Sequence, residues 1–389
     1  MKPEASSILV VDDIAENRDL LVRRLKRLGI EDVEQAENGV AALAALGRRQ
    51  FDLVLLDIMM PEMNGFQVLE HLKQNGRVHD IPIIVISALN EIEPVVRCIE
   101  LGAEDFLLKP FNPTLLRARV MATLEKKALR DVMRDELRRK QIELAEARTL
   151  QLALAPPPFR GAVGGRALTV DLVLEPAKEV GGDLVDHFGV GDDLLVLVLG
   201  DVSDKGAGAA LMMARTHALF RSLAVRPDAP ALFRAPEEAV RLVNATLAAG
   251  NSSCMFVTLL IAVLDGKSGR LTYVRAGHVP PFLRRSAGAI ERLAAAGGTP
   301  LGLIEDATYR PATVDLGPGD ELLIITDGVT EAMDPSKGLF GDAPVMEWFS
   351  RRDPSATPLL QLLSQVRAFE AGSPPSDDIA AILLKLMTG

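Results

Sequence analysis

Hydrophobic positions over residues 7 to about 122 come in short runs that alternate with amphipathic stretches. The runs SILVV, FDLVLLD, IPIIVIS and DFLLK are rich in Val, Ile and Leu, and stretches such as DLLVRRLKRLG and FQVLEHLKQ separate them. Regular alternation of strand-like and helix-like segments is typical of a parallel sheet covered on both faces. The pattern predicts an α/β domain over residues 1–122, with a doubly wound parallel sheet of five strands and five helices.

The pattern changes at about Arg117. From there to Arg148 the chain has no Gly or Pro, and apolar residues recur at an imperfect heptad spacing among many charges. This spacing predicts one long helix that pairs with a second copy as a dimeric coiled coil, and the alternative is a single solvated helix. Three prolines at 156–158 end the helix, because proline lacks the N–H and clashes with the preceding turn. We therefore expect a helical linker over residues 123–156.

Residues 157–389 have longer apolar runs, among them LLVLVLG, MFVTLLIAVLD and IAAILLKL, and two Ala-rich stretches near 207–224 and 236–249. Gly-rich connections between consecutive runs, such as LDGKSGRL, are typical of antiparallel hairpins. The pattern predicts an α+β domain in which helices pack on antiparallel sheet.

Composition narrows the class of protein. The net charge of −10 argues against a general nucleic-acid binder. The two cysteines, Cys98 and Cys254, are too few for a disulfide framework and fit a reducing compartment. The N-terminus has acidic residues where a signal peptide would have its apolar core, and no apolar run reaches the roughly 18–20 residues of a membrane span. These features predict a cytoplasmic protein.

Polar residues follow four of the strands predicted in the first domain. Asp12 and Asp13 follow the first strand, and Asp57, Ser87 and Lys109 follow the third, fourth and fifth. The carboxyl ends of parallel strands meet at one edge of a sheet, where ligands bind. Three carboxylates at that edge repel one another unless a divalent cation lies between them, and Mg²⁺ prefers oxygen ligands. With a lysine and a hydroxyl alongside, such a site can hold a phosphoryl group.

Residues 7–122 resemble the receiver domain of two-component response regulators, through the motifs VVDD, LLDIMMPEMNG, ISA and LKPF. The resemblance implies that Asp57 is the phosphorylated aspartate. It also implies a Mg²⁺ ion beside Asp57, held by Asp12, Asp13 and the carbonyl of Met59.

The same resemblance implies roles for three further residues. Ser87 is expected to be the switching hydroxyl, Phe106 the rotating aromatic side chain and Lys109 the partner of the phosphoryl group. The upstream partner is expected to be a sensor histidine kinase. The alternative is a receiver-like fold that is never phosphorylated.

A second set of acidic residues stands beside strand ends or glycine turns in the last domain: Asp183, Asp186, Asp201, Asp327, Asp377 and Asp378. If the fold gathers them, they form a dense negative cluster that metal ions can stabilise. Carboxylate oxygens favour Mg²⁺ or Mn²⁺ over Zn²⁺, and two such ions can activate a water for in-line attack on a phosphoester. The alternative is that these residues belong to scattered surface turns.

Residues from about 145 to 389 resemble the metal-dependent protein phosphatases of the PP2C class, in the SpoIIE-type branch, through VGGDLVD, GDVSDKGAGAALMMA, TDGVTEA and SDDIA. The implied fold is a sandwich of two antiparallel sheets flanked by helices. The resemblance implies two Mg²⁺ or Mn²⁺ ions. Their site is expected to consist of Asp183, Asp201, the Val202 carbonyl, Asp327 and Asp377, with Asp378 beside them as a further metal-site residue.

Two departures from that family's pattern stand near the expected ligands. Asp204 takes the place of a usual glycine, and Leu184 and Val185 take the place of an aromatic pair. Neither departure removes an expected ligand, although the charge of Asp204 could recruit an ion or repel a phosphoprotein.

The two resemblances together predict a response regulator whose phosphorylation controls a serine/threonine protein phosphatase, with a small anti-anti-sigma-type phosphoprotein as substrate. The alternative is an inactive phosphatase-like scaffold that sequesters a partner. A diguanylate cyclase output is disfavoured, because Leu184 and Val185 follow GGD where the GGDEF signature has acids. A DNA-binding output would need a compact basic helix-turn-helix, which residues 157–389 lack. His278 is expected to make a structural hydrogen bond.

Overall fold

The computed structural model describes residues 6–77, 80–88, 92–110, 112–351 and 357–388. The chain divides into two compact units, Met1–Lys140 and Gln141–Gly389, each with hydrophobic cores of its own. Among the described residues, no helix combines the length and the apolar character that crossing a bilayer requires.

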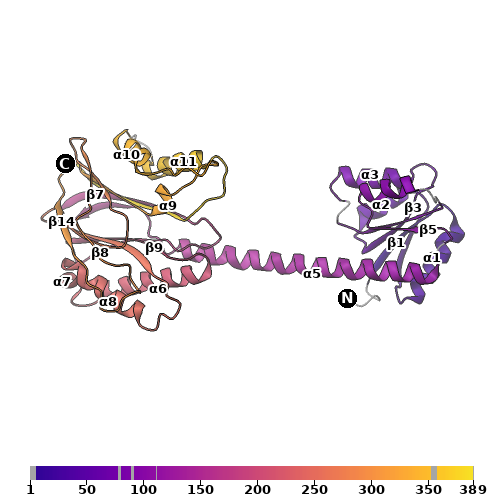
Figure 1. The fold of residues 1–389 in the computed structure, drawn as a ribbon, viewed down its shortest axis with the longest axis horizontal. Coiled ribbons are helices and arrows are strands. Elements are labelled where there is room, and N and C mark those ends of the chain that lie inside the picture. The colour runs from indigo at the N-terminus through magenta and orange to yellow at the C-terminus, as the bar shows by residue number, and fades with distance from the viewer. Residues whose placement is uncertain (1–5, 78–79, 89–91, 111, 352–356, 389) are drawn as a thin grey trace. The chain divides into compact units, whose positions relative to one another are not determined.

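The first unit is built on a five-stranded parallel sheet with strand order β2-β1-β3-β4-β5. Four helices connect the strands and a fifth follows the last one (Figure 1). The predicted doubly wound sheet is confirmed. The elements are β1 (Ser7–Val11), α1 (Ala15–Arg27), β2 (Asp32–Ala36), α2 (Gly39–Arg48), β3 (Leu53–Asp57), α3 (Gly65–Gln74), β4 (Ile83–Ser87), α4 (Ile92–Glu100), β5 (Asp105–Leu108) and α5 (Pro113–Leu152).

Both faces of this sheet are covered, which is why its strands are apolar almost throughout. On one face, α2 and α3 pack over a cluster that includes Val54, Leu56 and Leu69. On the other face, Leu21 of α1 and Val120 of α5 pack on the opposite side chains of the same strands. The first turns of α5 therefore belong to the core of this unit.

Helix α5 continues for 40 residues without Gly or Pro after its first position. Beyond the residues that pack on the first sheet, it carries large apolar side chains that are 57–64% exposed, namely Leu129, Val132, Met133 and Leu137. Their spacing of three and four residues places them on one face of the helix. The pairing of this face with a second copy stays a prediction.

The second unit is a sandwich of two antiparallel sheets, with strand orders β14-β11-β10-β9-β8 and β13-β12-β15-β16-β7-β6. Side chains from both sheets, among them Leu197, Leu260 and Ile382, form the layer between them. The predicted sandwich with flanking helices is confirmed. Its strands are β6 (Phe159–Val163), β7 (Arg166–Glu175), β8 (Leu184–Val190), β9 (Leu194–Val202), β10 (Val257–Asp265), β11 (Arg270–Ala276), β12 (Phe282–Arg284), β13 (Ile290–Arg292), β14 (Ala312–Asp315), β15 (Glu321–Ile325) and β16 (Ile379–Leu386).

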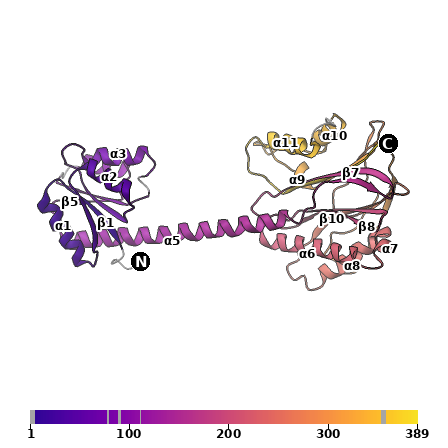
Figure 2. The same ribbon diagram turned by 180° about the vertical axis from the view of Figure 1, so that it is seen from behind.

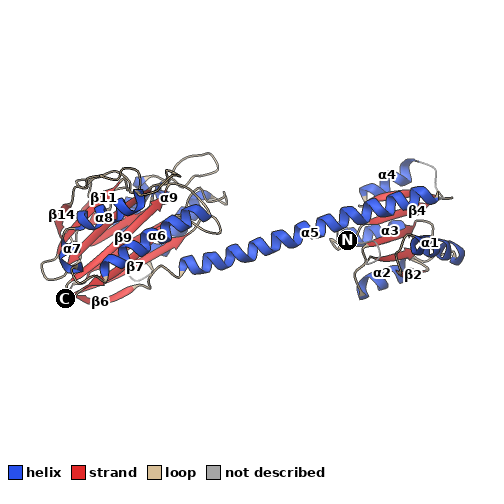
Figure 3. Ribbon diagram, turned by 90° about the horizontal axis from the view of Figure 1, so that it is seen from below, coloured by secondary structure: helices blue, strands red, loops and turns tan. Residues whose placement is uncertain are grey.

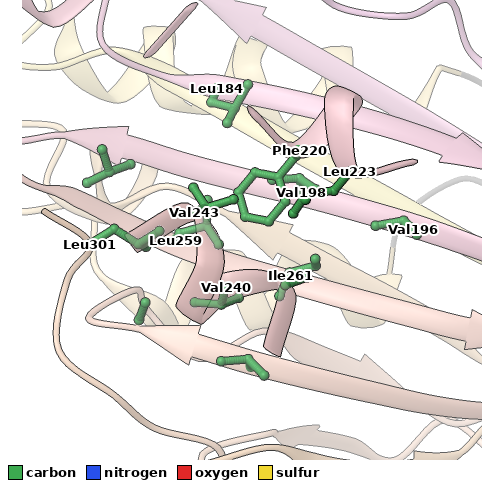
Figure 4. Packing of buried hydrophobic residues seen from close by; sticks show 14 of the residues in the cluster. Leu184, Val196, Val198, Phe220, Leu223, Val240, Val243, Leu259, Ile261 and Leu301 are labelled. Carbon is green, nitrogen blue, oxygen red and sulfur yellow. The ribbon is translucent and has the colours of Figure 1, made fainter. Parts of the chain in front are cut away.

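Helices cover the outer face of each sheet, as Figures 2 and 3 show. The five-stranded sheet carries α6 (Ala207–Ala224), α7 (Ala229–Arg234) and α8 (Pro236–Ala248), and Figure 4 shows Phe220 and Val240 of these helices against Val198 and Ile261 of the strands. The six-stranded sheet carries α10 (Asp342–Arg351) and α11 (Pro358–Glu370). A short helix, α9 (Asp327–Thr330), follows β15 directly.

Candidate functional site

The first cluster of polar side chains lies at the carboxyl edge of the parallel sheet. Lys109, which follows β5, places its Nζ 2.7 Å from an oxygen of Asp12 and 2.7 Å from an oxygen of Asp57. The ligand oxygens of Asp12, Asp13 and Asp57 all lie within 4.8 Å of one another. Parallel strands in this order place residues from three distant parts of the sequence in one spot, as the strand-end argument predicts.

Electrostatics in this cluster are set by burial and by Lys109. Asp12 and Asp57 are 1% and 3% exposed. Burial raises the pKa of Asp57, and the ammonium of Lys109 opposes this rise. One lysine faces three carboxylates, so the oxygen donors fit a further cation, and Mg²⁺ suits a donor set made only of oxygens.

Several local contacts hold the cluster in place. Oδ1 of Asp12 accepts hydrogen bonds from the Ile14 N–H (3.0 Å) and from the amide of Asn17 (3.1 Å), and Arg18 donates to the Asp12 carbonyl (2.7 Å). These contacts orient Asp12 while leaving its Oδ2 to Lys109. Asn17 and Arg18 were not predicted from the sequence, because residues on a helix after the first strand carry no strand-end signal.

The loop after β3 is fixed by a glycine. A Cβ on Gly65 would lie 2.5 Å from the carbonyl oxygen of Asp57, so only glycine allows this approach. The approach folds the segment that contains Met59 back over the strand end, and the side chain of Met59 is 62% exposed. Ser87 ends β4 and is 7% exposed, and Phe106 is a partly buried residue of β5.

The second cluster lies in the sandwich, where strand ends from both sheets approach one another. Asp183 directly precedes β8 and Asp201 is the next-to-last residue of β9 in one sheet. Asp327 follows β15, and Asp377 precedes β16, in the other sheet. Thr326 joins the two sheets here, because its hydroxyl donates a 2.9 Å hydrogen bond to Oδ2 of Asp183.

Burial and mutual repulsion raise the pKa values of these acids. The pKa of Asp183 lies well above its ordinary value, first because of burial and then because of Asp201 and Asp378. The pKa of Asp201 rises to about 7, through burial and the charges of Asp327, Asp377 and Asp378. Burial, then Glu331 and Asp377, raise the pKa of Asp327. Negative charge without compensation, carried by oxygen donors, fits Mg²⁺ or Mn²⁺.

The acids of the second cluster are more widely spaced than those of the first. Among the described residues, only Asp12, Asp13 and Asp57 of the first cluster form a group of three or more His, Cys, Asp or Glu side chains whose ligand atoms all lie within 4.8 Å of one another. Bridging by two cations suits the wider spacing, since each ion needs only some of the carboxylates.

The adjacent residues Asp377 and Asp378 face different partners. Asp378 is 5% exposed, and its two oxygens accept hydrogen bonds from the N–H groups of Ala177 (2.7 Å) and Gly182 (2.6 Å). Asp377 lies 3.1 Å from Nζ of Lys205. Asp378 therefore organises the backbone of the loop that precedes Asp183. Asp377 instead forms an ion pair with the ammonium group of Lys205.

Two glycines in this region are needed for close packing. A Cβ on Gly181 would lie 2.3 Å from an oxygen of Asp378, and a Cβ on Gly328 would lie 1.9 Å from the Asp378 carbonyl. The glycines of the GGD and TDG motifs thus let three segments meet at Asp378. In the sequence, the glycines of these motifs therefore indicate the position of this site as clearly as the acidic residues do.

Other residues that stand out in the sequence have structural partners. Asp186 is 1% exposed and accepts two hydrogen bonds from Arg221 of α6, at 2.7 and 2.6 Å, so it does not join the acid cluster. His278 is buried with its Nδ1 3.3 Å from the hydroxyl of Thr258, and burial lowers its pKa to about 4. Asp204 is exposed and accepts a hydrogen bond from the N–H of Lys205.

Three residues at the second cluster were not predicted. Thr326 holds Asp183, Lys205 pairs with Asp377, and the amide of Gln151, near the end of α5, bonds to the backbone of Gly181. Thr326 is the first residue of the TDG motif and could have been inferred from it. Gln151 is neither an acid nor a glycine, and its role depends on a contact with the backbone of Gly181, so the acid and glycine pattern gives no signal for it.

Comparison with known proteins matches both units. The model of the family described as Stage II sporulation protein E (SpoIIE) matches residues 191–387, and the model of the response regulator receiver domain matches residues 8–121. Protein IcfG of Synechocystis sp. is 34% identical over 235 residues, which are 55% of this chain and 37% of that protein. Response regulator PleD of Caulobacter vibrioides is 36% identical over 184 residues, which are 47% of this chain and 39% of that protein. The chain thus spans well under half the length of these two relatives.

Among solved structures, the SiaA-PP2C domain of Pseudomonas aeruginosa superposes with a TM-score of 0.53 at 17% identity, and the match covers 65% of this chain and 99% of that domain. This likeness supports the fold of the second unit. The SpoIIE model alone covers half of the 389 residues. The chain therefore belongs to the SpoIIE family and combines a PP2C-like phosphatase domain of that type with an N-terminal response regulator receiver domain.

Proposed function

We propose that the protein is a response regulator in which phosphorylation of Asp57 controls a metal-dependent serine/threonine protein phosphatase. The observation that carries the proposal is the cluster of Asp183, Asp201 and Asp327, whose raised pKa values reflect burial and then the repulsion of neighbouring acids at the meeting point of two sheets. Buried acids with such pKa values cluster at functional sites.

The phosphatase ligands in this proposal are Asp183, Asp201, the Val202 carbonyl, Asp327 and Asp377. When bound, two Mg²⁺ or Mn²⁺ ions supply an activated water and stabilise charge on the phosphoryl group. Thr326 orients Asp183 for this role, and Asp378 holds the backbone that leads to it.

In the receiver, the carboxylate of Asp57 takes up the phosphoryl group, and the Mg²⁺ site consists of Asp12, Asp13, Asp57 and the Met59 carbonyl. Nζ of Lys109 lies 2.7 Å from Oδ2 of Asp57, so its ammonium can pair with the phosphoryl oxygens after Asp57 is phosphorylated. Ser87 and Phe106 report the modification to the rest of the domain. The phosphoryl donor is a sensor histidine kinase.

The substrate that we propose is a small phosphorylated anti-anti-sigma-type protein, whose dephosphorylation lets it bind its partner kinase in a partner-switching pathway of the cytoplasm. We further propose that the protein acts as a homodimer through a coiled coil of α5. The exposed apolar face made of Leu129, Val132, Met133 and Leu137 supports this pairing. The predicted boundaries, with a receiver over residues 1–122, a linker over 123–156 and a phosphatase over 157–389, remain part of the proposal.

Turnover tests this function. The purified chain is incubated with Mn²⁺ and candidate phosphoproteins, with and without acetyl phosphate, and released phosphate is measured. Metal-dependent release that changes with acetyl phosphate is the expected result. Stoichiometric binding of a phosphoprotein without release would instead indicate the inactive scaffold.

A further inference from the structure

The last turn of α5 contacts the loop between β7 and β8 at two places. Gln151 donates from Nε2 to the Gly181 carbonyl (2.6 Å), and its Oε1 accepts from the Gly181 N–H (3.0 Å). Three residues earlier, Arg148 donates to the carbonyl of Lys178 (2.9 Å). One side chain thus satisfies both backbone groups of a single residue.

This contact is buried and anchored. Gln151 is 6% exposed, so water cannot readily replace the hydrogen bonds between its amide and the backbone of Gly181 if they are lost. After the helix, Leu154 packs against the core under α6 and Ala155 against the core between the sheets. The end of α5 is therefore part of the second unit's interior.

The loop that Gln151 holds is the one that delivers Asp183. Gly181 and Gly182 lie between Gln151 on one side and Asp378 on the other, because the Gly182 N–H donates to Asp378 (2.6 Å). The next residue, Asp183, is fixed at its side chain by Thr326. Its backbone position depends on the two side chains that hold the glycines.

We infer that Gln151 is a positioning residue, which sets the affinity of the phosphatase site for divalent metal by fixing the backbone that precedes Asp183. It touches neither substrate nor metal. Because Gln151 belongs to α5, a rotation or shift of that helix changes the geometry of a metal ligand through a single residue. This regulatory part rests on the proposed function, whereas the effect on metal affinity does not require turnover.

The test compares Gln151→Met with Gln141→Met in the full chain. Methionine keeps the length of the side chain but lacks the donor and the acceptor, and Gln141 is exposed on the same helix and serves as the matched control. Binding of Mn²⁺ is followed by the loss of the free-ion signal in electron paramagnetic resonance; the site at Asp12, Asp13 and Asp57 is the same in all variants, so a difference between binding curves reports the phosphatase site. Partners of metal ligands typically contribute 10–100-fold in affinity, so we expect the dissociation constant to rise by about 10-fold or more in Gln151→Met and to stay unchanged in Gln141→Met.

Two further readouts separate positioning from a general loss of structure. In the protein without metal, hydrogen exchange at the Gly181 amide should quicken in Gln151→Met, while the thermal midpoint of the fold stays well above the assay temperature. At saturating Mn²⁺, kcat should return close to the parent value, since the ligands themselves are intact. If Gln151→Met does not fold, Arg148→Ala removes the more exposed contact with Lys178 and should weaken Mn²⁺ binding in the same direction.

The outcomes distinguish this inference from the proposed function. Equal Mn²⁺ affinities for the parent and Gln151→Met, or for the parent and Arg148→Ala where the first variant is unfolded, would overturn the inference alone. Failure of the parent protein to bind Mn²⁺ would overturn both. A raised dissociation constant together with faster Gly181 exchange supports the positioning role even if no phosphoprotein is turned over.

Discussion

Asp201→Asn should make the protein without metal more stable while abolishing its phosphatase activity. The folded state raises the pKa of Asp201 from 3.8 to about 7, which is about three pKa units. At about 1.36 kcal/mol per unit, the ionised carboxylate destabilises the fold by about 4 kcal/mol at pH 8. The neutral amide removes this penalty. The expected net gain is therefore on the order of 4 kcal/mol.

The direction of the pH dependence follows from the same shift. Between pH 3.8 and about 7 the folded state binds more protons at Asp201 than the unfolded state does, so the stability of the parent falls as pH rises through this window. The Asn variant lacks this contribution, and its advantage should grow from pH 5.5 to pH 8. With divalent metal present, the parent should be the more stable of the two proteins. The metal stabilises the folded parent by binding to it, whereas it binds the variant only weakly.

The assay is denaturant unfolding of the second unit at pH 8 in EDTA, followed by the same measurement with Mn²⁺. Asp378→Asn is the matched control. This variant makes the same Asp-to-Asn change at a neighbouring acid. Both oxygens of Asp378 accept backbone hydrogen bonds, however, so Asp378→Asn should be less stable than the parent. A parent protein as stable as Asp201→Asn in EDTA at pH 8 would refute the view that the cluster carries negative charge without compensation.

Three further predictions follow from other parts of the chain. Asp57→Asn should not be labelled by acetyl phosphate, because an amide oxygen is too poor a nucleophile to form the acyl phosphate; equal labelling of variant and parent would place the acceptor elsewhere. Inserting four residues after Leu137 rotates the rest of α5 by about 40°, which should preserve Asp57 labelling and basal phosphatase activity but remove their coupling; an unchanged response to acetyl phosphate would contradict this. Burial lowers the pKa of His278 to about 4, so at this residue the unfolded state binds more protons between pH 4 and 6.5, and His278 contributes a loss of about 3 kcal/mol on acidification that opposes the gain from Asp201; the stability of His278→Gln relative to the parent should therefore rise by about 3 kcal/mol from pH 6.5 to pH 4, and identical pH slopes in urea unfolding would show that His278 does not titrate as described.

The receiver site was predictable from sequence because its geometry follows from topology. In a doubly wound sheet the strand ends share one edge, so Asp12, Asp57 and Lys109 had to come together once their strands were identified. What sequence could not supply were the contacts of Asn17 and Arg18, which depend on how α1 leaves the strand.

The phosphatase site was less predictable because neighbouring acids look alike in a sequence. Asp183 and Asp186 lie three residues apart, yet one joins the cluster and the other binds Arg221 on the helix side of the sheet. Asp377 and Asp378 are adjacent, yet the second is occupied by two backbone N–H groups. Side-chain direction alternates along an extended chain, so the choice depends on register, which spacing alone does not reveal.

In the proposed mechanism, the loop held by Gln151 is an effective place for control because of the free energies involved. To move a two-state phosphatase from 1:99 to 99:1, a signal must supply about 5.5 kcal/mol of preference. The charge on Asp201 alone costs about 4 kcal/mol, first through burial and then through repulsion, and the raised pKa values of Asp183 and Asp327 have the same causes. A helix that only determines whether Asp183 is in place therefore needs to supply a small part of this free energy itself. In the proposed mechanism the rest comes from metal binding once the ligand set is complete, so α5 acts through one buried amide and does not have to rebuild the domain.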